Sequence, residues 1–218
     1  MRNDTGRGLF ITLEGGDSCG KTTQIELIRQ WLTELGITPV MTREPGGTAL
    51  GNEIRALILH GPEDVDPRCE ALLYAADRAY HMATKVRPAL TQGRVVVQDR
   101  YLDSSVAYQG TARALGVEEI RELNMWATNN LLPDVTLLLD IDPVKAQARR
   151  TRELDRLERE PIEFHQRIRQ QYLALAQAEP ERFHVLDAAR SPSEIQADIR
   201  RILTPLIQSF VIDGQAQS

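Results

Sequence analysis

The clearest chemical signal in the sequence is a glycine-rich segment that ends in a lysine and a threonine. It reads Gly15-Gly16-Asp17-Ser18-Cys19-Gly20-Lys21-Thr22, the pattern G-x-x-x-x-G-K-T, and Thr23 follows it. Glycine allows dihedrals and close approaches that a Cβ would block, so successive backbone N–H groups can converge on phosphate oxygens. In such a loop the lysine contacts the β- and γ-phosphates and the threonine hydroxyl ligates Mg²⁺. The segment therefore predicts a nucleotide phosphate site.

The segments on either side of this loop support that interpretation. An apolar run over residues 9–14 leads directly into it, and a helical spacing of apolar residues follows until Gly36. The start of a helix adds unpaired amides and the positive end of its dipole, both of which favour a bound anion. The alternative is a glycine turn with a solvated lysine, and the strand and helix on its flanks argue against that alternative.

Two more segments place charged residues where a buried strand is expected to end. Residues 42–48 contain Arg43 and Glu44 before a Pro-Gly-Gly turn, and residues 95–101 bring Asp99 and Arg100. The ends of parallel strands hold the ligands of open α/β sheets, so Arg43 and Arg100 are candidates for phosphate contacts. Asp99 is a candidate for Mg²⁺ or its water shell. A surface turn and a structural ion pair are the respective alternatives.

A third segment is rich in arginine and follows the apolar run at residues 135–140. It contains Arg149, Arg150, Arg152 and Arg156. We expect a lid over residues 145–160 that brings these arginines to a transferring phosphoryl group. A solvated helix face is the alternative that a charge run more often represents.

The elements that must position these residues alternate along the chain. Short apolar runs occupy residues 9–14, 39–42, 95–99, 135–140 and 183–186. Asp66-Pro67, Asp142-Pro143 and the sequence Ser191-Pro192-Ser193-Glu194 predict helix starts between and after them. Nearly continuous apolar strands alternating with helices indicate a doubly wound α/β fold with a five-stranded parallel sheet. We expect one domain over residues 1–218, ordered from about 9 to 210, with a helical lid.

Composition excludes several classes of protein. The chain has 218 residues, a net charge of −5 and 42% apolar residues, which are values of a globular domain rather than of a disordered chain. It lacks the basic excess typical of proteins that bind nucleic acid or membrane surfaces. Its two cysteines, Cys19 and Cys69, make no disulfide framework, and no apolar run approaches a membrane span. We expect a soluble cytoplasmic protein.

Taken together, these segments resemble the bacterial thymidylate kinases from residue 9 to about residue 206. The similarity lies in residues 14–23, in residues 42–47 and, most specifically, in residues 99–110. It implies transfer of a phosphoryl group from ATP to dTMP with Mg²⁺, in a P-loop fold, and a homodimer that forms through helices near residues 66–92 and 116–130. The phosphate loop has Ser18 where some relatives carry a basic residue, which agrees with a charge supplied by the lid.

The resemblance also implies roles for individual residues. Asp17 matches the residue that reaches the 3′-hydroxyl of dTMP, and Arg43, Arg55 and Arg100 match phosphate contacts. Tyr74 matches the ring that stacks on thymine, and Arg78 matches the arginine that faces its O4 edge. Tyr108 matches the ring that excludes a ribose 2′-hydroxyl. Glu44, Ser104, Ser105 and Gln109 complete the expected nucleotide pocket.

Two other functions stay open at this point. Related P-loop kinases phosphorylate other nucleotides or deoxynucleosides with the same fold. A nucleotide-dependent switch that hydrolyses ATP only to change state would carry the same loop. No histidine-based catalytic set is expected, because a phosphate acceptor is already nucleophilic at neutral pH.

Overall fold

The computed structural model describes residues 8–149 and 154–215, and it contains one five-stranded parallel sheet. The strand order is β2-β3-β1-β4-β5, with β1 in the centre. The strands are β1 (Phe10–Glu14), β2 (Val40–Arg43), β3 (Val96–Asp99), β4 (Val135–Asp140) and β5 (Phe183–Asp187). Each bound lies within one residue of the expected one, so the expected doubly wound α/β fold is confirmed. The order of the strands reverses at β1, because β2 and β3 lie on one side of it and β4 and β5 on the other. Ligands of doubly wound folds bind at such a switch point.

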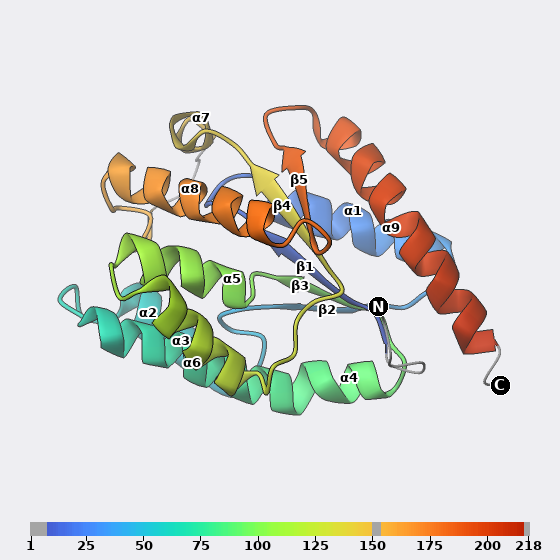
Figure 1. Cartoon of the computed structure of the whole chain (residues 1–218), viewed down its shortest axis with the longest axis horizontal. Helices are drawn as coiled ribbons and strands as arrows, with labels where there is room; N and C mark the ends of the chain where they lie inside the picture. The colour runs from blue at the N-terminus through green and yellow to red at the C-terminus, as the bar shows by residue number, and fades with distance from the viewer. Residues whose placement is uncertain (1–7, 150–153, 216–218) are drawn as a thin grey trace.

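Helices cover both faces of this sheet (Figure 1). Helices α1 and α9 lie over one face, and α8 and the group from α2 to α6 lie over the other. The α-helices are α1 (Lys21–Glu34), α2 (Ala49–His60), α3 (Pro67–His81), α4 (Arg87–Thr91), α5 (Leu102–Ser105), α6 (Val117–Ala127), α7 (Pro143–Gln147), α8 (Ile162–Ala178) and α9 (Pro192–Gln215). Two π-helical segments, Met82–Val86 and Val106–Ala112, continue α3 and α5. Among the described residues, we find no helix with the length and apolar character needed to span a membrane.

The predicted helix starts are confirmed by their side-chain caps. Asp66 accepts from the amide of Arg68 at 2.9 Å, and Asp142 accepts from that of Val144 at 2.9 Å. At the start of α9 the amide of Ser191 donates to the Glu194 carboxylate at 3.0 Å, and the amide of Glu194 donates back to the Ser191 hydroxyl at 3.3 Å. These contacts satisfy amides that the first turn of a helix leaves unpaired.

Alternate side chains of β1 enter different cores. Ile11 and Leu13 pack under α1 and α9, against Ile28 and Ile199. Phe10 points to the opposite face, where its ring meets that of Tyr101 edge-on at 5.2 Å. This period of two also directs Glu14, the last residue of β1, to the face that carries α5 and α8.

The lid differs from the expected one. Between the end of α7 and the start of α8, the described residues contain turns and no helix. The amide of Asp155 donates to the Glu158 carboxylate at 3.1 Å, and the amide of Glu158 donates to the Asp155 carboxylate at 2.9 Å. These reciprocal bonds close a turn and compete with helical pairing. Residues 150–153, which include the expected lid residues Arg150 and Arg152, lie outside the described residues.

Candidate active site

The phosphate loop connects β1 to α1 with a backbone that glycine makes possible. Gly15 has φ +135°, and a Cβ there would lie 2.5 Å from the carbonyl oxygen of Leu139 on β4. Gly20 has φ +101° and immediately precedes α1. The buried ammonium of Lys21 donates to the carbonyls of Gly15 at 3.0 Å and Gly16 at 2.9 Å. The loop therefore holds a positive charge beside the free amides of a helix N-terminus.

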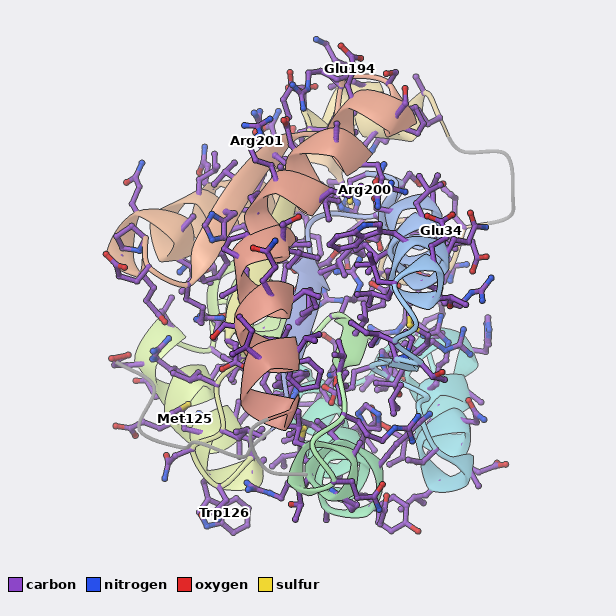
Figure 2. The ribbon with its side chains drawn as sticks, turned by 90° about the vertical axis from the view of Figure 1, so that its right-hand side faces the viewer. Glu34, Met125, Trp126, Glu194, Arg200 and Arg201 are labelled. Carbon is purple, nitrogen blue, oxygen red and sulfur yellow. The ribbon has the colours of Figure 1, made fainter. Side chains whose placement is uncertain are left out.

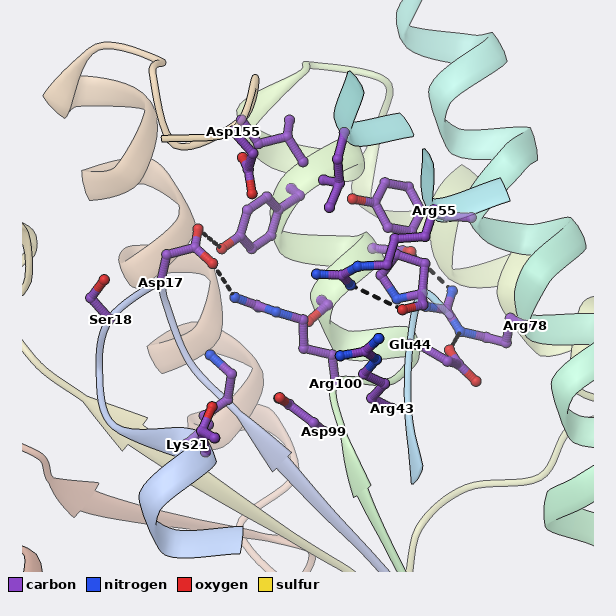
Figure 3. A pocket seen from close by; sticks show the side chains of 18 of the residues that line it. Asp17, Ser18, Lys21, Arg43, Glu44, Arg55, Arg78, Asp99, Arg100 and Asp155 are labelled. Carbon is purple, nitrogen blue, oxygen red and sulfur yellow. Dashed lines mark hydrogen bonds and ion pairs between the residues drawn. The ribbon is translucent and has the colours of Figure 1, made fainter. Parts of the chain in front are cut away.

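A cleft of about 560 Å³ opens beside this loop at the carboxyl ends of the strands (Figure 3). Most of the expected site residues line it, although they come from six separate stretches of chain. They are Asp17, Ser18, Gly20, Lys21, Thr22, Thr23, Arg43, Glu44, Arg55, Tyr74, Arg78, Asp99, Arg100, Ser104, Ser105, Tyr108, Gln109 and Arg149. Gly15 and Gly16 line a smaller cavity behind the loop, and the Cys19 side chain is buried in the core.

Three arginines from different elements point into the middle of the cleft. Arg43 ends β2, Arg55 lies on α2, and Arg100 follows β3, and Figure 3 shows their guanidinium groups facing a common space. Burial lowers the pKa of Arg55, and the charges of Arg43 and Arg100 lower it further. Positive groups that repel one another in this way favour a ligand with several negative charges, and a phosphate matches them.

Arg100 is fixed to the phosphate loop by its own contacts. Its φ of +63° lies in the left-handed region, and its amide donates to the Leu13 carbonyl at 3.0 Å. Its guanidinium donates to the Gly15 carbonyl at 3.0 Å and to the Asp17 carboxylate at 2.6 Å. A non-glycine residue held in this backbone region is a feature of functional sites.

Asp17 also accepts a hydrogen bond from the Tyr108 hydroxyl, at 2.9 Å. Burial alone would raise the pKa of Asp17. The charges of Arg100 and Lys21 and the bond from Tyr108 outweigh burial and lower this pKa to about 2. The Arg100 guanidinium lies 5.2 Å from the centre of the Tyr108 ring. Asp17 is therefore ionised at neutral pH and joins the phosphate loop to the other wall of the cleft.

Glu14 does not line the cleft but contacts a residue that does, and sequence reasoning assigned it no role. It is fully buried and accepts from the amide of Tyr101 at 2.7 Å, the hydroxyl of Ser104 at 2.6 Å and the hydroxyl of Tyr172 at 2.9 Å. Burial, assisted by the charge of Asp103, raises the pKa of Glu14 to about 7. Glu14 directly precedes the glycine-rich loop in the sequence, and this is the signal from which a role near the site could have been predicted.

Arg78 lies at the opposite end of the cleft and is buried among acceptors. It donates to the Glu44 carboxylate at 2.6 Å, the Ser105 hydroxyl at 2.9 Å and the Tyr101 carbonyl at 3.0 Å, and it also contacts the Asn124 side chain. The other oxygen of Glu44 lies 2.8 Å from a ring nitrogen of His81, a partner that sequence reasoning did not find. Arg78 is thus held rigidly where it lines the cleft.

Arg156 is not where we expected it. We placed it in a lid at the transferring phosphoryl group, but its guanidinium is buried and donates to the Glu70 carboxylate at 2.6 Å and the Ile58 carbonyl at 3.1 Å. Arg156 is not among the residues that line the cleft. A buried carboxylate attracts a guanidinium strongly, and that pairing holds Arg156 in the wall. Arg149 does line the cleft, and it donates to the carbonyl of Ala188 at 2.8 Å.

A magnesium ion fits the residues beside the phosphate loop. Thr22 and Asp99 both line the cleft, and Oδ1 of Asp99 is buried with no hydrogen-bond partner among the described residues. Within residues 8–149 and 154–215, no group of three histidine, cysteine or carboxylate side chains could hold a metal by itself. Mg²⁺ is usually held by one or two protein groups together with substrate phosphates and water, which suits this pair.

Comparison with known proteins gives a consistent result. The model of the thymidylate kinase family matches residues 13–199. A thymidylate kinase of Leifsonia xyli subsp. xyli is 62% identical over 197 residues, which cover 88% of this chain and 93% of that protein. One from Bifidobacterium longum subsp. infantis is 53% identical over 210 residues, covering 94% of this chain and 90% of that protein.

A solved structure agrees with the sequence comparisons. The crystal structure of thymidylate kinase from Ehrlichia chaffeensis superposes with a TM-score of 0.77 at 30% identity, covering 90% of this chain and 99% of that one. The likeness in sequence and in three dimensions extends over nearly the whole chain, including the strands and loops that line the cleft. The chain belongs to the thymidylate kinase family.

Proposed function

We propose that the protein transfers the γ-phosphoryl group of ATP to dTMP, forming ADP and dTDP on the way to dTTP. The observation that carries this proposal is the cleft itself, in which the phosphate loop faces a cluster of three arginines. The phosphate loop suits the phosphates of a nucleoside triphosphate, and the arginine cluster suits a second phosphorylated substrate. An ATPase switch would need only the phosphate loop.

The acceptor requires little chemical activation. A phosphate monoester has a second pKa near 6, so the acceptor is mostly a dianion at neutral pH and is already nucleophilic. Catalysis can then rest on positioning and on neutralising the charge of a loose transition state. Lys21 and Arg100 both bring positive charge to the phosphate loop, where each donates to the carbonyl of Gly15 at 3.0 Å, which agrees with that requirement.

The arginine cluster is the proposed site of the dTMP phosphate. Arg43, Arg55 and Arg100 would hold its oxygens, and Arg149 would add charge from the lid side. We assign Asp17 to the 3′-hydroxyl of the sugar, because an ionised carboxylate with bonds to Arg100 and Tyr108 retains lone pairs that can accept another hydrogen bond.

The nucleobase would lie at the far end of the cleft, near Arg78. Arg78 would donate to O4 of thymine, Tyr74 would stack on the ring, and the Tyr108 ring would exclude a 2′-hydroxyl. Glu44, Ser104, Ser105 and Gln109 line the same cleft. The contacts that hold Arg78 and Tyr108 in place support these roles, because a rigid site discriminates better than a mobile one.

Mg²⁺ is the proposed metal. When bound, it would neutralise charge on the β- and γ-phosphates. The Thr22 hydroxyl and the free oxygen of Asp99 are its candidate protein contacts.

The test of this function is the formation of ADP with different acceptors. We expect ADP to form rapidly with dTMP and much more slowly with dCMP, dGMP or thymidine. Preference for another nucleotide or for thymidine would support the other-kinase alternative. Equal ADP formation with and without an acceptor would support the ATPase switch.

We further propose a homodimer and a cytoplasmic location. Large apolar side chains are exposed on α3 and α6, with Leu72 at 58%, Tyr80 at 44% and Trp126 at 82% exposure, and Figure 2 shows Trp126 projecting into solvent. Such groups are enriched at interfaces between subunits. Sedimentation analysis of the wild type and of Trp126→Glu tests this, and a monomeric wild type would contradict it. Free Cys19 and Cys69 agree with a reducing compartment.

A further inference from the structure

The buried carboxylate of Glu70 does not line the cleft, but it contacts a residue that does. Glu70 lies on α3 and is fully buried. One of its oxygens accepts from the side-chain amide of Gln109 at 2.9 Å, and the other accepts from Arg156 at 2.6 Å. Arg113 approaches both oxygens at 3.4 Å. Arg156 and Arg113 therefore both face the charge of Glu70, although Arg113 also pairs with Glu160 at 2.6 Å, while the remaining contact is directed at a residue of the cleft.

The contact with Glu70 determines which way the Gln109 amide points. An ionised carboxylate can only accept hydrogen bonds, so Gln109 has to present its NH₂ group to Glu70. Gln109 also lines the cleft. With its nitrogen turned to Glu70, the group that it offers to the cleft is the carbonyl oxygen Oε1, which is an acceptor. The chemistry of the partner thus decides an orientation that the shape of an amide leaves open.

This orientation complements one pyrimidine edge and not another. Thymine presents an acceptor at O4 and a donor at N3–H, whereas cytosine presents a donor at N4 and an acceptor at N3. In the same cleft Arg78 offers only donors and Gln109 offers Oε1. A donor and an acceptor that face the same base match thymine at both atoms and oppose cytosine at both.

We infer that Glu70 is a positioning residue for base specificity, and that it acts by holding the Gln109 carbonyl toward N3–H of the pyrimidine. This inference rests on the proposed dTMP acceptor and deepens it. The carboxylate does not touch the substrate. It allows one of the two orientations of Gln109, and without it the amide could rotate and present its NH₂ group to N3 of cytosine.

The test compares three acceptors in the purified full-length enzyme. We expect Glu70→Gln to reduce the preference for dTMP over dCMP, measured as the ratio of kcat/KM values, by roughly 10- to 100-fold, the scale on which polar groups discriminate substrates. The preference for dTMP over dUMP should change less than about 2-fold, because uracil presents the same two atoms as thymine. This second ratio distinguishes a lost amide orientation from a generally damaged pocket.

Two matched variants distinguish an effect on the orientation of Gln109 from an effect on the stability of the fold. Arg113→Gln removes a charge contact of Glu70 but leaves the contact to Gln109, so it should preserve both ratios. Glu70→Asp retains the negative charge for the arginines but withdraws it from Gln109 by one methylene group. It should reduce the dTMP preference over dCMP even if Glu70→Gln fails to fold.

A double-mutant cycle completes the experiment. In a Gln109→Met background the change at Glu70 should have no further effect on the dTMP to dCMP ratio, because Glu70 acts through Gln109. The inference is overturned if Glu70→Gln or Glu70→Asp keeps the wild-type ratio, or if the effect persists in the Gln109→Met background. Failure of the proposed function would look different, because the wild type itself would then show no preference for dTMP.

Discussion

Replacing Glu14 with glutamine should change how the stability of the protein depends on pH. Glu14 is fully buried, and burial is the main cause that raises its pKa from 4.5 to about 7, with a smaller contribution from Asp103. Hydrogen bonds from Ser104 and the amide of Tyr101 and the charge of Arg100 oppose the rise without cancelling it. The folded protein therefore keeps a proton on Glu14 at pH values where the unfolded chain has released it.

The size and sign of the effect follow from this difference in proton binding. A group whose pKa is raised by folding stabilises the native state fully below its unfolded pKa, and that contribution is lost as the pH rises through the folded pKa. A rise from 4.5 to about 7, at about 1.4 kcal/mol for each pH unit, amounts to roughly 3–4 kcal/mol in total. Glutamine stays neutral, so Glu14→Gln lacks this dependence. The free energy of unfolding of wild type minus that of the variant should fall by roughly 2–3 kcal/mol as the pH rises from 5 to 8.

Urea unfolding followed by circular dichroism at several pH values from 5 to 8 measures this difference. Other titrating groups are common to both proteins and cancel in the subtraction. The matched control is Glu26→Gln on the exposed surface of α1, where hydrogen bonds from Arg29 and Gln30 lower the pKa of Glu26 to about 2. Its contribution is lost only as the pH falls below the unfolded pKa, so its difference curve should be flat in the same range. A flat curve for Glu14→Gln as well would refute the argument, since it would mean that Glu14 is ionised throughout.

The remaining predictions concern catalysis and the wall of the cleft. Lys21→Ala should lower kcat by at least ~10²-fold because it removes a charge beside the transferred group, and turnover near the wild-type value would contradict the role of the phosphate loop. Asp99→Asn should shift the Mg²⁺ concentration needed for half-maximal activity upwards with little change in ATP binding, whereas an unchanged Mg²⁺ titration would indicate a purely structural aspartate. Arg156→Ala should lower the free energy of unfolding by about 3 kcal/mol in urea, because Arg113 is then the only guanidinium that pairs with the buried carboxylate of Glu70. A small loss of stability with a large loss of kcat would instead support a catalytic role for Arg156 in the lid.

Much of the fold was predictable from the sequence because its signals are local. Residues 15–22 need glycine at particular positions of one continuous turn, and that requirement is visible without any partner. The caps at Asp66 and Asp142 involve amides two and three residues away, so they also follow from neighbouring residues. The three central strands β1, β3 and β4 are buried along nearly their whole length, and apolar runs marked all five strands to within one residue.

The lid was less predictable because its arginines looked equivalent in the sequence. Arg149 and Arg156 lie seven positions apart in one charged stretch, yet one lines the cleft and the other is buried in the wall. The difference is decided by Glu70, a carboxylate 86 residues away from Arg156. A pattern of charges cannot show which of them has a buried partner.

The sequence by itself determined the phosphate loop, the order of strands and helices, and the candidate residues for two phosphorylated substrates. Only the tertiary structure decided the ionisation of Glu14, the orientation of Gln109 and the position of Arg156. The bond between Tyr172 and Glu14 joins residues 158 positions apart. Burial and hydrogen-bond partners of this kind arise when distant segments pack together, and they set both the charge of a group and the direction in which it points.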